Sequence, residues 1–241
     1  MDELTLHRGL TLGLIAAALP TLLLLLFLSA PYGRHGRPGW GPTLPPRVGW
    51  ILMESPAVLV WLGVYLVGPN RGDLVPLVLL AMWQTHYVHR TFVFPFRLPN
   101  GGRPMPLFIA ASGAFFNVLN AYVNARWVSG FGEYPIEWLR TPWFVGGAAV
   151  FALGMAINLH ADTVLLKLRA PGETGYKIPK GGLYRYVTCP NYLGELLEWA
   201  GWTLATASLA GFSFFVFTAG NLVPRAVTHH RWYRERFARH G

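Results

Sequence analysis

The sequence alternates long apolar segments with short polar ones, and the apolar segments are long enough to cross a lipid bilayer. The first of them, Leu6 to Ser29, is nearly unbroken and longer than the core of a signal peptide, so we interpret it as a retained helix. Hydrophobic residues make up 53% of the chain and charged residues only 13%, which is too apolar for an ordinary soluble domain. The sequence therefore predicts an all-α integral membrane protein.

We expect residues 1–241 to form a single transmembrane domain, a bundle of about seven helices. The predicted helices lie near residues 6–29, 49–67, 74–94, 106–127, 143–168, 192–208 and 212–236. Loops on one side of such a bundle would hold 16 of the 20 lysines and arginines. Because cytoplasmic loops carry an excess of these cations, we place the carboxyl terminus in the cytoplasm and the amino terminus outside. This topology explains the net charge of +9 better than nucleic-acid binding does.

Carboxylates inside apolar helices are costly and usually mark functional sites. In the stretch Cys189 to Trp202, a helix would place Asn191, Glu195 and Glu198 on one face. This face either lines a site or clamps a neighbouring helix by hydrogen bonds. Glu54 is a second such acid, in the predicted helix 49–67, and its alternative interpretation is an acid that reaches water at the interface.

Other polar groups lie near the predicted helix ends on the cytoplasmic side. Tyr87 and Arg90 are one turn apart, as are Asn158 and Asp162. The Gly-, Pro- and Lys-rich loop that follows residue 169 suits phosphates, or is simply a solvated basic loop. A stripe of asparagines either lines a cavity or bonds a neighbouring helix: Asn117, Asn120 and Asn124.

The histidine pairs are too few to indicate a metal site, so we expect no metal. The single cysteine, Cys189, excludes an internal disulfide.

Several segments together resemble the steroid 5α-reductase family of membrane enone reductases. They are HYVHRTFVFPFR, NGGRPMP, INLHAD, APGETGYKIPKGGLYRYV with PNYLGELLEW, and HHRWYRERF, and the resemblance runs from about Tyr32 to the end of the chain. The resemblance implies a helical bundle that holds NADPH on the cytoplasmic side and reduces the Δ4 double bond of a 3-oxo steroid. It also implies a lipophilic steroid as the partner, in the inner membrane of a bacterium or the endoplasmic reticulum of a eukaryote.

The resemblance also assigns residues. Glu54 and Tyr87 match the catalytic pair that engages the steroid ketone, and Trp50 and Phe116 are expected beside the substrate. The positions expected in the cofactor pocket are Arg103, Asn158, Asp162, Arg169, Tyr176, Asn191, Glu195, Arg225, His229 and Tyr233.

These residue types suit the implied chemistry. Enone reduction needs a hydride at the β-carbon and a donor at the carbonyl oxygen, and a tyrosine oriented by a glutamate is such a donor. No GxGxxG motif follows a strand, so a dinucleotide site would be built from helix-borne side chains. The alternatives are a related reductase of polyprenol or enoyl-CoA substrates, an S-adenosylmethionine-dependent isoprenylcysteine-type methyltransferase, and a small proton-coupled transporter. We expect a monomer.

Overall fold

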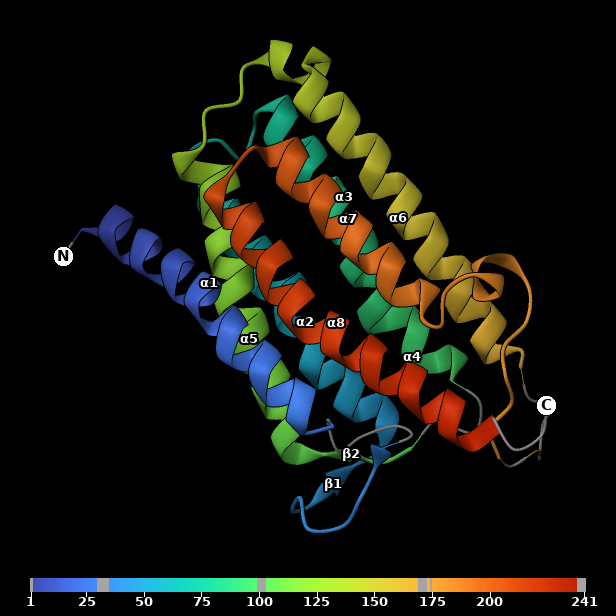
Figure 1. Ribbon diagram of the computed structural model, residues 1–241. Coiled ribbons are helices and arrows are strands. Elements are labelled where there is room, and N and C mark those ends of the chain that lie inside the picture. The colour runs from blue at the N-terminus through green and yellow to red at the C-terminus, as the bar shows by residue number, and fades with distance from the viewer. Residues whose placement is uncertain (1, 30–34, 99–102, 169–172, 174, 238–241) are drawn as a thin grey trace.

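The computed structural model describes residues 2–29, 35–98, 103–168, 173 and 175–237. In this part of the chain, seven helices of 15 residues or more account for most of the structure. They are α1 (Glu3–Phe27), α2 (Pro46–Leu66), α3 (Leu74–Val88), α5 (Leu107–Arg126), α6 (Pro142–Leu166), α7 (Pro190–Thr206) and α8 (Leu209–Phe237). Figure 1 shows them packed side by side, and the closest pairs are α6 with α7, α2 with α5, and α1 with α8.

Six of the long helices begin and end within three residues of the predicted ranges, and the third differs more. The sequence predicted one helix over 74–94, whereas α3 ends at Val88 and continues as a π-helical turn, His89–Val93, and the short helix α4 (Phe94–Arg97). Pro95 explains the break, because it has no N–H to donate to the carbonyl four residues earlier. The two short strands β1 (Thr43–Leu44) and β2 (Met105–Pro106) pair antiparallel at the same end of the bundle (Figure 1).

Four helices of the described residues are long and apolar enough to cross a membrane. These candidate spans are Glu3–Phe27, Pro46–Leu66, Leu107–Phe131 and Pro142–Leu166. The helices α3 and α7 are shorter, at 15 and 17 residues, and α8 carries four arginines and two histidines. Membrane crossing by these three helices therefore stays a prediction.

The contact between α6 and α7 depends on glycines. A Cβ atom on Gly154 of α6 would meet the backbone nitrogen of Glu198, and one on Gly194 of α7 would lie 2.5 Å from the backbone nitrogen of Asn158. Backbones this close leave no room for a side chain, as in the small-residue interfaces of other membrane helices. The close approach brings the polar ends of α6 and α7 together.

We expect Gly154→Ala to destabilise the bundle, because the added methyl group meets backbone atoms that cannot rotate away. Overpacking of this kind costs about 1–3 kcal/mol. Gly146→Ala is the matched control, since a Cβ there meets nothing within 4 Å on the same helix. Thermal melting in detergent should show a lower midpoint than the parent for Gly154→Ala and an unchanged midpoint for Gly146→Ala. Equal midpoints in the two variants would contradict the close contact.

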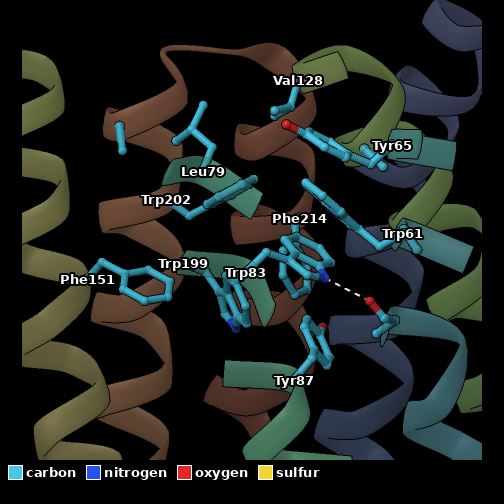
Figure 2. Packing of buried hydrophobic residues seen from close by; sticks show 14 of the residues in the cluster. Trp61, Tyr65, Leu79, Trp83, Tyr87, Val128, Phe151, Trp199, Trp202 and Phe214 are labelled. Atoms are coloured by element: carbon cyan, nitrogen blue, oxygen red, sulfur yellow. Dashed lines mark hydrogen bonds between the residues drawn. The ribbon is translucent and has the colours of Figure 1, made fainter. Parts of the chain in front are cut away.

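A cluster of aromatic side chains joins α2, α3, α7 and α8 in the interior (Figure 2). Trp83 lies at its centre, with ring centroids 5.7 Å from Trp61 and 5.5 Å from Trp199, and its indole N–H donates to the carbonyl of Ala57 at 2.8 Å. Tyr87 lies one turn below Trp83 on α3, at the edge of the cluster. The aromatic cluster therefore holds one of the predicted catalytic residues in a fixed position.

Candidate active site

Glu54 is half-buried on α2 and is held by a neighbouring helix. The side-chain amide of Asn117 on α5 donates to Glu54 Oε2 at 3.1 Å and to the carbonyl of Met53 at 2.8 Å. Arg90 and Glu195 also interact electrostatically with Glu54. Carboxylates from two helices and one arginine therefore meet here, and these partners favour a site over an acid that only reaches water at the interface.

The Tyr87 ring is fixed on several sides. Its centroid lies 4.9 Å from that of Trp83 and 5.6 Å from that of Trp199 (Figure 2). The ring of the neighbouring His86 is 4.9 Å away. Glu54 is among the charges that act on its hydroxyl. The hydrogen bonds of the described residues join Glu54 to Asn117 and not to Tyr87, so the action of the two side chains as one unit stays a prediction.

The asparagine stripe on α5 divides between the two interpretations. Asn117 faces Glu54, as described above. Asn124 accepts a hydrogen bond from the Trp202 indole at 2.8 Å and donates to Asn120 at 2.9 Å, so it clamps α5 to α7. Only the end of the stripe nearest Glu54 belongs to the site.

Arg90 connects the site to the end of α6. Its guanidinium lies over the rings of Trp50 and Phe94, at 4.8 and 4.7 Å from their centroids, and Nη1 is 3.4 Å from Asp162 Oδ2. The sequence showed that Arg90 is one turn from Tyr87 but assigned it no role. The π-helical turn that carries Arg90 starts just after Tyr87 and places the two side chains in the same site.

Asn158, Asp162 and Asn191 form one network across the contact of α6 and α7. Asn158 donates to the carbonyl of Asn191 at 3.0 Å, and the Asn191 amide donates to Asp162 Oδ1 at 3.3 Å. Glu195, one turn beyond Asn191, is half-buried and interacts with Arg90. Four of the predicted cofactor residues are thus neighbours, which the glycine contact makes possible.

The remaining predicted cofactor residues lie around the carboxyl-terminal part of α8. Arg225 donates to Asn221 at 3.0 Å and lies over the ring of Tyr192, whose hydroxyl is 3.2 Å from His229 Nε2. The second nitrogen of His229 is 3.2 Å from His35.

A separate group forms nearby. The Arg103 guanidinium lies over the ring of Tyr176, which packs on Trp232 at 4.9 Å, and Trp232 packs on Tyr233 at 5.3 Å. Arg169 lies outside the described residues. Of the predicted substrate residues, Trp50 lies under Arg90, and Phe116 stacks on Phe217 at 4.1 Å.

A buried ion pair behind Tyr87 was not predicted. His86 Nδ1 lies 2.7 Å from Glu198 Oε1, and the side chain of Glu198 is fully buried. The other carboxylate oxygen of Glu198 has no hydrogen-bond partner among the described residues. The clamp interpretation therefore holds for Glu198, whereas Asn191 and Glu195 face the network with Asp162 and Arg90. The sequence singled out Glu198, but nothing in it indicated that Glu198 meets His86.

Comparisons with known proteins point to one family of enzymes. A family model described as 3-oxo-5-alpha-steroid 4-dehydrogenase matches residues 103–240. The chain is 44% identical over 242 residues to Steroid 5-alpha-reductase DET2 of Gossypium hirsutum, which covers 98% of this chain and 93% of the relative. It is 45% identical to 3-oxo-5-alpha-steroid 4-dehydrogenase 1 of Rattus norvegicus, over 87% of this chain and 82% of the relative. The enzyme of the same description from Homo sapiens is 41% identical, over 86% and 80%.

Proposed function

The chain belongs to the 3-oxo-5-alpha-steroid 4-dehydrogenase family, the steroid 5α-reductases, and we propose that Glu54, Tyr87 and NADPH together reduce the Δ4 double bond of a 3-oxo steroid here. Steroid 5α-reduction is the activity of this family, and its members are membrane-bound enzymes that use NADPH. The observation that carries the proposal is the convergence of Glu54, Tyr87 and Arg90 beside the aromatic cluster. These residues come from two helices and a π-helical turn. The family match favours this reaction over methyl transfer, transport and the reduction of other lipids.

The donor groups near the cytoplasmic end fit a dinucleotide. Guanidinium groups suit phosphates, and Arg103 and Arg225 both lie over aromatic rings that could also flank a base or ribose. Amide and carboxylate groups of Asn158, Asp162 and Asn191 suit a carboxamide, because they offer donors and acceptors side by side. We propose that these residues, with Glu195, His229 and Tyr233, hold NADPH.

NADPH, when bound, supplies the hydride that reaches the β-carbon of the enone. The protein's contribution is at the other end of the enone, where negative charge develops on the carbonyl oxygen. We assign to the Tyr87 hydroxyl the donation of a hydrogen bond to this oxygen, with Glu54 next to it and Asn117 holding the carboxylate in place. The aromatic cluster excludes water, so a fixed hydrogen-bond donor beside it stabilises negative charge more than it would in solution.

The environment of this pair suits a flat apolar substrate. Trp50 and Phe116 present aromatic faces, and the neighbouring residue of Glu54, Met53, accepts a hydrogen bond from Asn117 at its carbonyl. We propose that they flank the steroid rings, and that the substrate enters from the bilayer.

We also propose that the cation-rich end of the bundle faces the cytoplasm. Figure 1 shows the carboxyl end of α8, the segment after α6 and the amino end of α2 at the same end of the molecule. These segments carry about half of the 20 lysines and arginines. A cytosolic dinucleotide would reach Arg225 and His229 from this side.

The reaction can be tested directly with the purified chain in detergent. Loss of nicotinamide absorbance should require both NADPH and a 3-oxo-Δ4 steroid, and mass spectrometry should find a product two hydrogens heavier. A 3-oxo steroid that is already reduced at the Δ4 position is the control and should consume no NADPH. Steroid-independent consumption, or an unreduced steroid, would refute the proposal.

The cofactor assignment predicts that Arg225→Ala raises the KM for NADPH by roughly 10-fold or more and the KM for steroid much less, since charge-assisted contacts to phosphate are lost. Arg169→Ala is expected to act in the same direction. Arg140→Ala is the control, because Arg140 is exposed between α5 and α6 at the other end of the bundle. An unchanged KM for NADPH in Arg225→Ala would mean that the phosphates bind elsewhere.

A further inference from the structure

A cavity lies outside the Glu54 and Tyr87 site. It has a volume of about 440 Å³, within the usual range of ligand sites. The segment after α6 forms one wall and the last turns of α8 form the other. Its lining residues are Ile178, Pro179, Tyr184, Arg185, Tyr186, Val187, Thr188, His230, Tyr233, Arg234 and Phe237. Tyr233 is shared with the proposed cofactor residues, and no other lining residue has a role in the reaction proposed above.

The cavity has a cationic rim without acidic residues. Arg185 and Arg234 line it, and neither forms an ion pair with a carboxylate of the residues that the structure describes. No aspartate or glutamate is among its lining residues. An anion would therefore meet two guanidinium groups, whereas the ammonium of a zwitterionic group would find no carboxylate.

A hydrogen bond between the two walls adds a polar group. Thr188 Oγ1 lies 2.7 Å from His230 Nδ1, which ties the segment to α8 and fixes the orientation of the imidazole. A Thr188 hydroxyl that donates to Nδ1 leaves the proton of His230 on Nε2, as a further donor next to Arg234.

The same cavity has exposed apolar walls. Tyr186 is 80% exposed, Ile178 48% and Val187 37%. These residues follow α6, a candidate span that ends at Leu166, so they lie near the end of the membrane-crossing part of the bundle. Tyrosine beside aliphatic and cationic side chains is the composition of a membrane interface, where apolar groups meet acyl chains and cations meet headgroups.

We propose that this cavity binds one anionic phospholipid, with the headgroup phosphate at Arg185, Arg234 and His230 and an acyl chain along Ile178, Tyr186 and Val187. The exposed apolar wall favours a lipid over a soluble phosphate. The absence of acidic lining residues favours an anionic headgroup over phosphatidylcholine. The site would anchor the segment that connects α6 to α7 to the membrane surface.

The test uses the full chain, purified in a neutral detergent and titrated with phosphatidylglycerol or phosphatidylcholine under native mass spectrometry. Phosphatidylglycerol should bind at one molecule per chain and phosphatidylcholine should not. The double variant Arg185→Gln/Arg234→Gln should lose roughly 30-fold in apparent affinity for phosphatidylglycerol, from the removal of two cations at a headgroup. Arg234→Gln alone changes only an exposed helix position, and its apparent affinity for phosphatidylglycerol should fall by less than that of the double variant.

The control is Arg231→Gln/Arg236→Gln, which removes the same charge from α8 outside the cavity lining. An equal loss in this control would show a general surface attraction and refute the site. Displacement of phosphatidylglycerol by NADPH would assign the cavity to the cofactor and also refute it. Steroid reduction does not enter this test, so its outcome is independent of the proposed reaction.

Discussion

Replacing Tyr87 with phenylalanine is expected to lower kcat roughly 10²- to 10³-fold, the usual cost of losing one fixed donor at a developing oxyanion. The substitution keeps the ring, so the contacts with Trp83 and Trp199 remain. It removes the hydroxyl that we assign to the carbonyl oxygen. Because the loss is confined to the transition state, the KM for NADPH should hardly change.

Glu54→Gln tests whether the two side chains act as one unit. It keeps the shape and a group that Asn117 can still bond, and it removes the charge next to Tyr87. Turnover should fall, and the double variant Glu54→Gln/Tyr87→Phe should be little worse than Tyr87→Phe alone. If the fold reductions of the two single variants multiply in the double variant, Glu54 and Tyr87 have separate roles.

Tyr65→Phe is a matched control for the lost hydroxyl. Tyr65 belongs to the same aromatic cluster, at the opposite end from Tyr87 (Figure 2), and its hydroxyl donates to the carbonyl of Arg71 at 2.9 Å. In single-turnover measurements with saturating NADPH, Tyr65→Phe should reduce the steroid at the parental rate. A Tyr87→Phe enzyme that also turns over at the parental rate would reduce Tyr87 to a packing residue.

The helices and the neighbours of Glu54 could be predicted because local patterns encode them. Apolar length predicted the seven long helices, which Figure 1 shows. An acid inside an apolar helix needs polar neighbours, and Asn117 and Arg90 provide them. The family resemblance contributed the pairing of Glu54 with Tyr87, which spacing alone does not indicate.

Contacts between distant helices could not be predicted, because they depend on how closely two backbones approach. Gly154 and Gly194 are ordinary residues in the sequence, yet they set the distance at which Asn158 meets Asn191. The asparagines of α5 follow one helical spacing in the sequence, yet they contact different helices. Asn117 bonds Glu54 of α2, and Asn124 bonds Trp202 of α7. The π-helical turn after Val88 is a different case, because the sequence feature that accounts for it, Pro95 without an N–H, is local.

Glu198→Ala is expected to destabilise the protein by about 3–5 kcal/mol, the cost of leaving one partner of a buried ion pair alone. In the parent, Glu198 Oε1 lies 2.7 Å from His86 Nδ1, and the ring of His86 packs against Trp199 with centroids 4.7 Å apart. The substitution would leave this buried Nδ1 without its partner. Unfolding in a denaturing detergent, or melting in a mild one, should report this loss. The loss should appear without NADPH and without steroid, because the pair acts on the fold.

Three further variants separate the ion pair from simple packing. Glu198→Gln keeps an oxygen that can accept from His86, so it should lose less than Glu198→Ala. The double variant His86→Leu/Glu198→Met removes both buried polar groups and should recover most of the stability of the parent, as apolar replacements of buried pairs often do. His86→Leu alone should be as damaging as Glu198→Ala, since it leaves a fully buried carboxylate without its partner. If the double variant is instead the least stable of the set, the pair contributes stability of its own and the desolvation argument fails for this bundle.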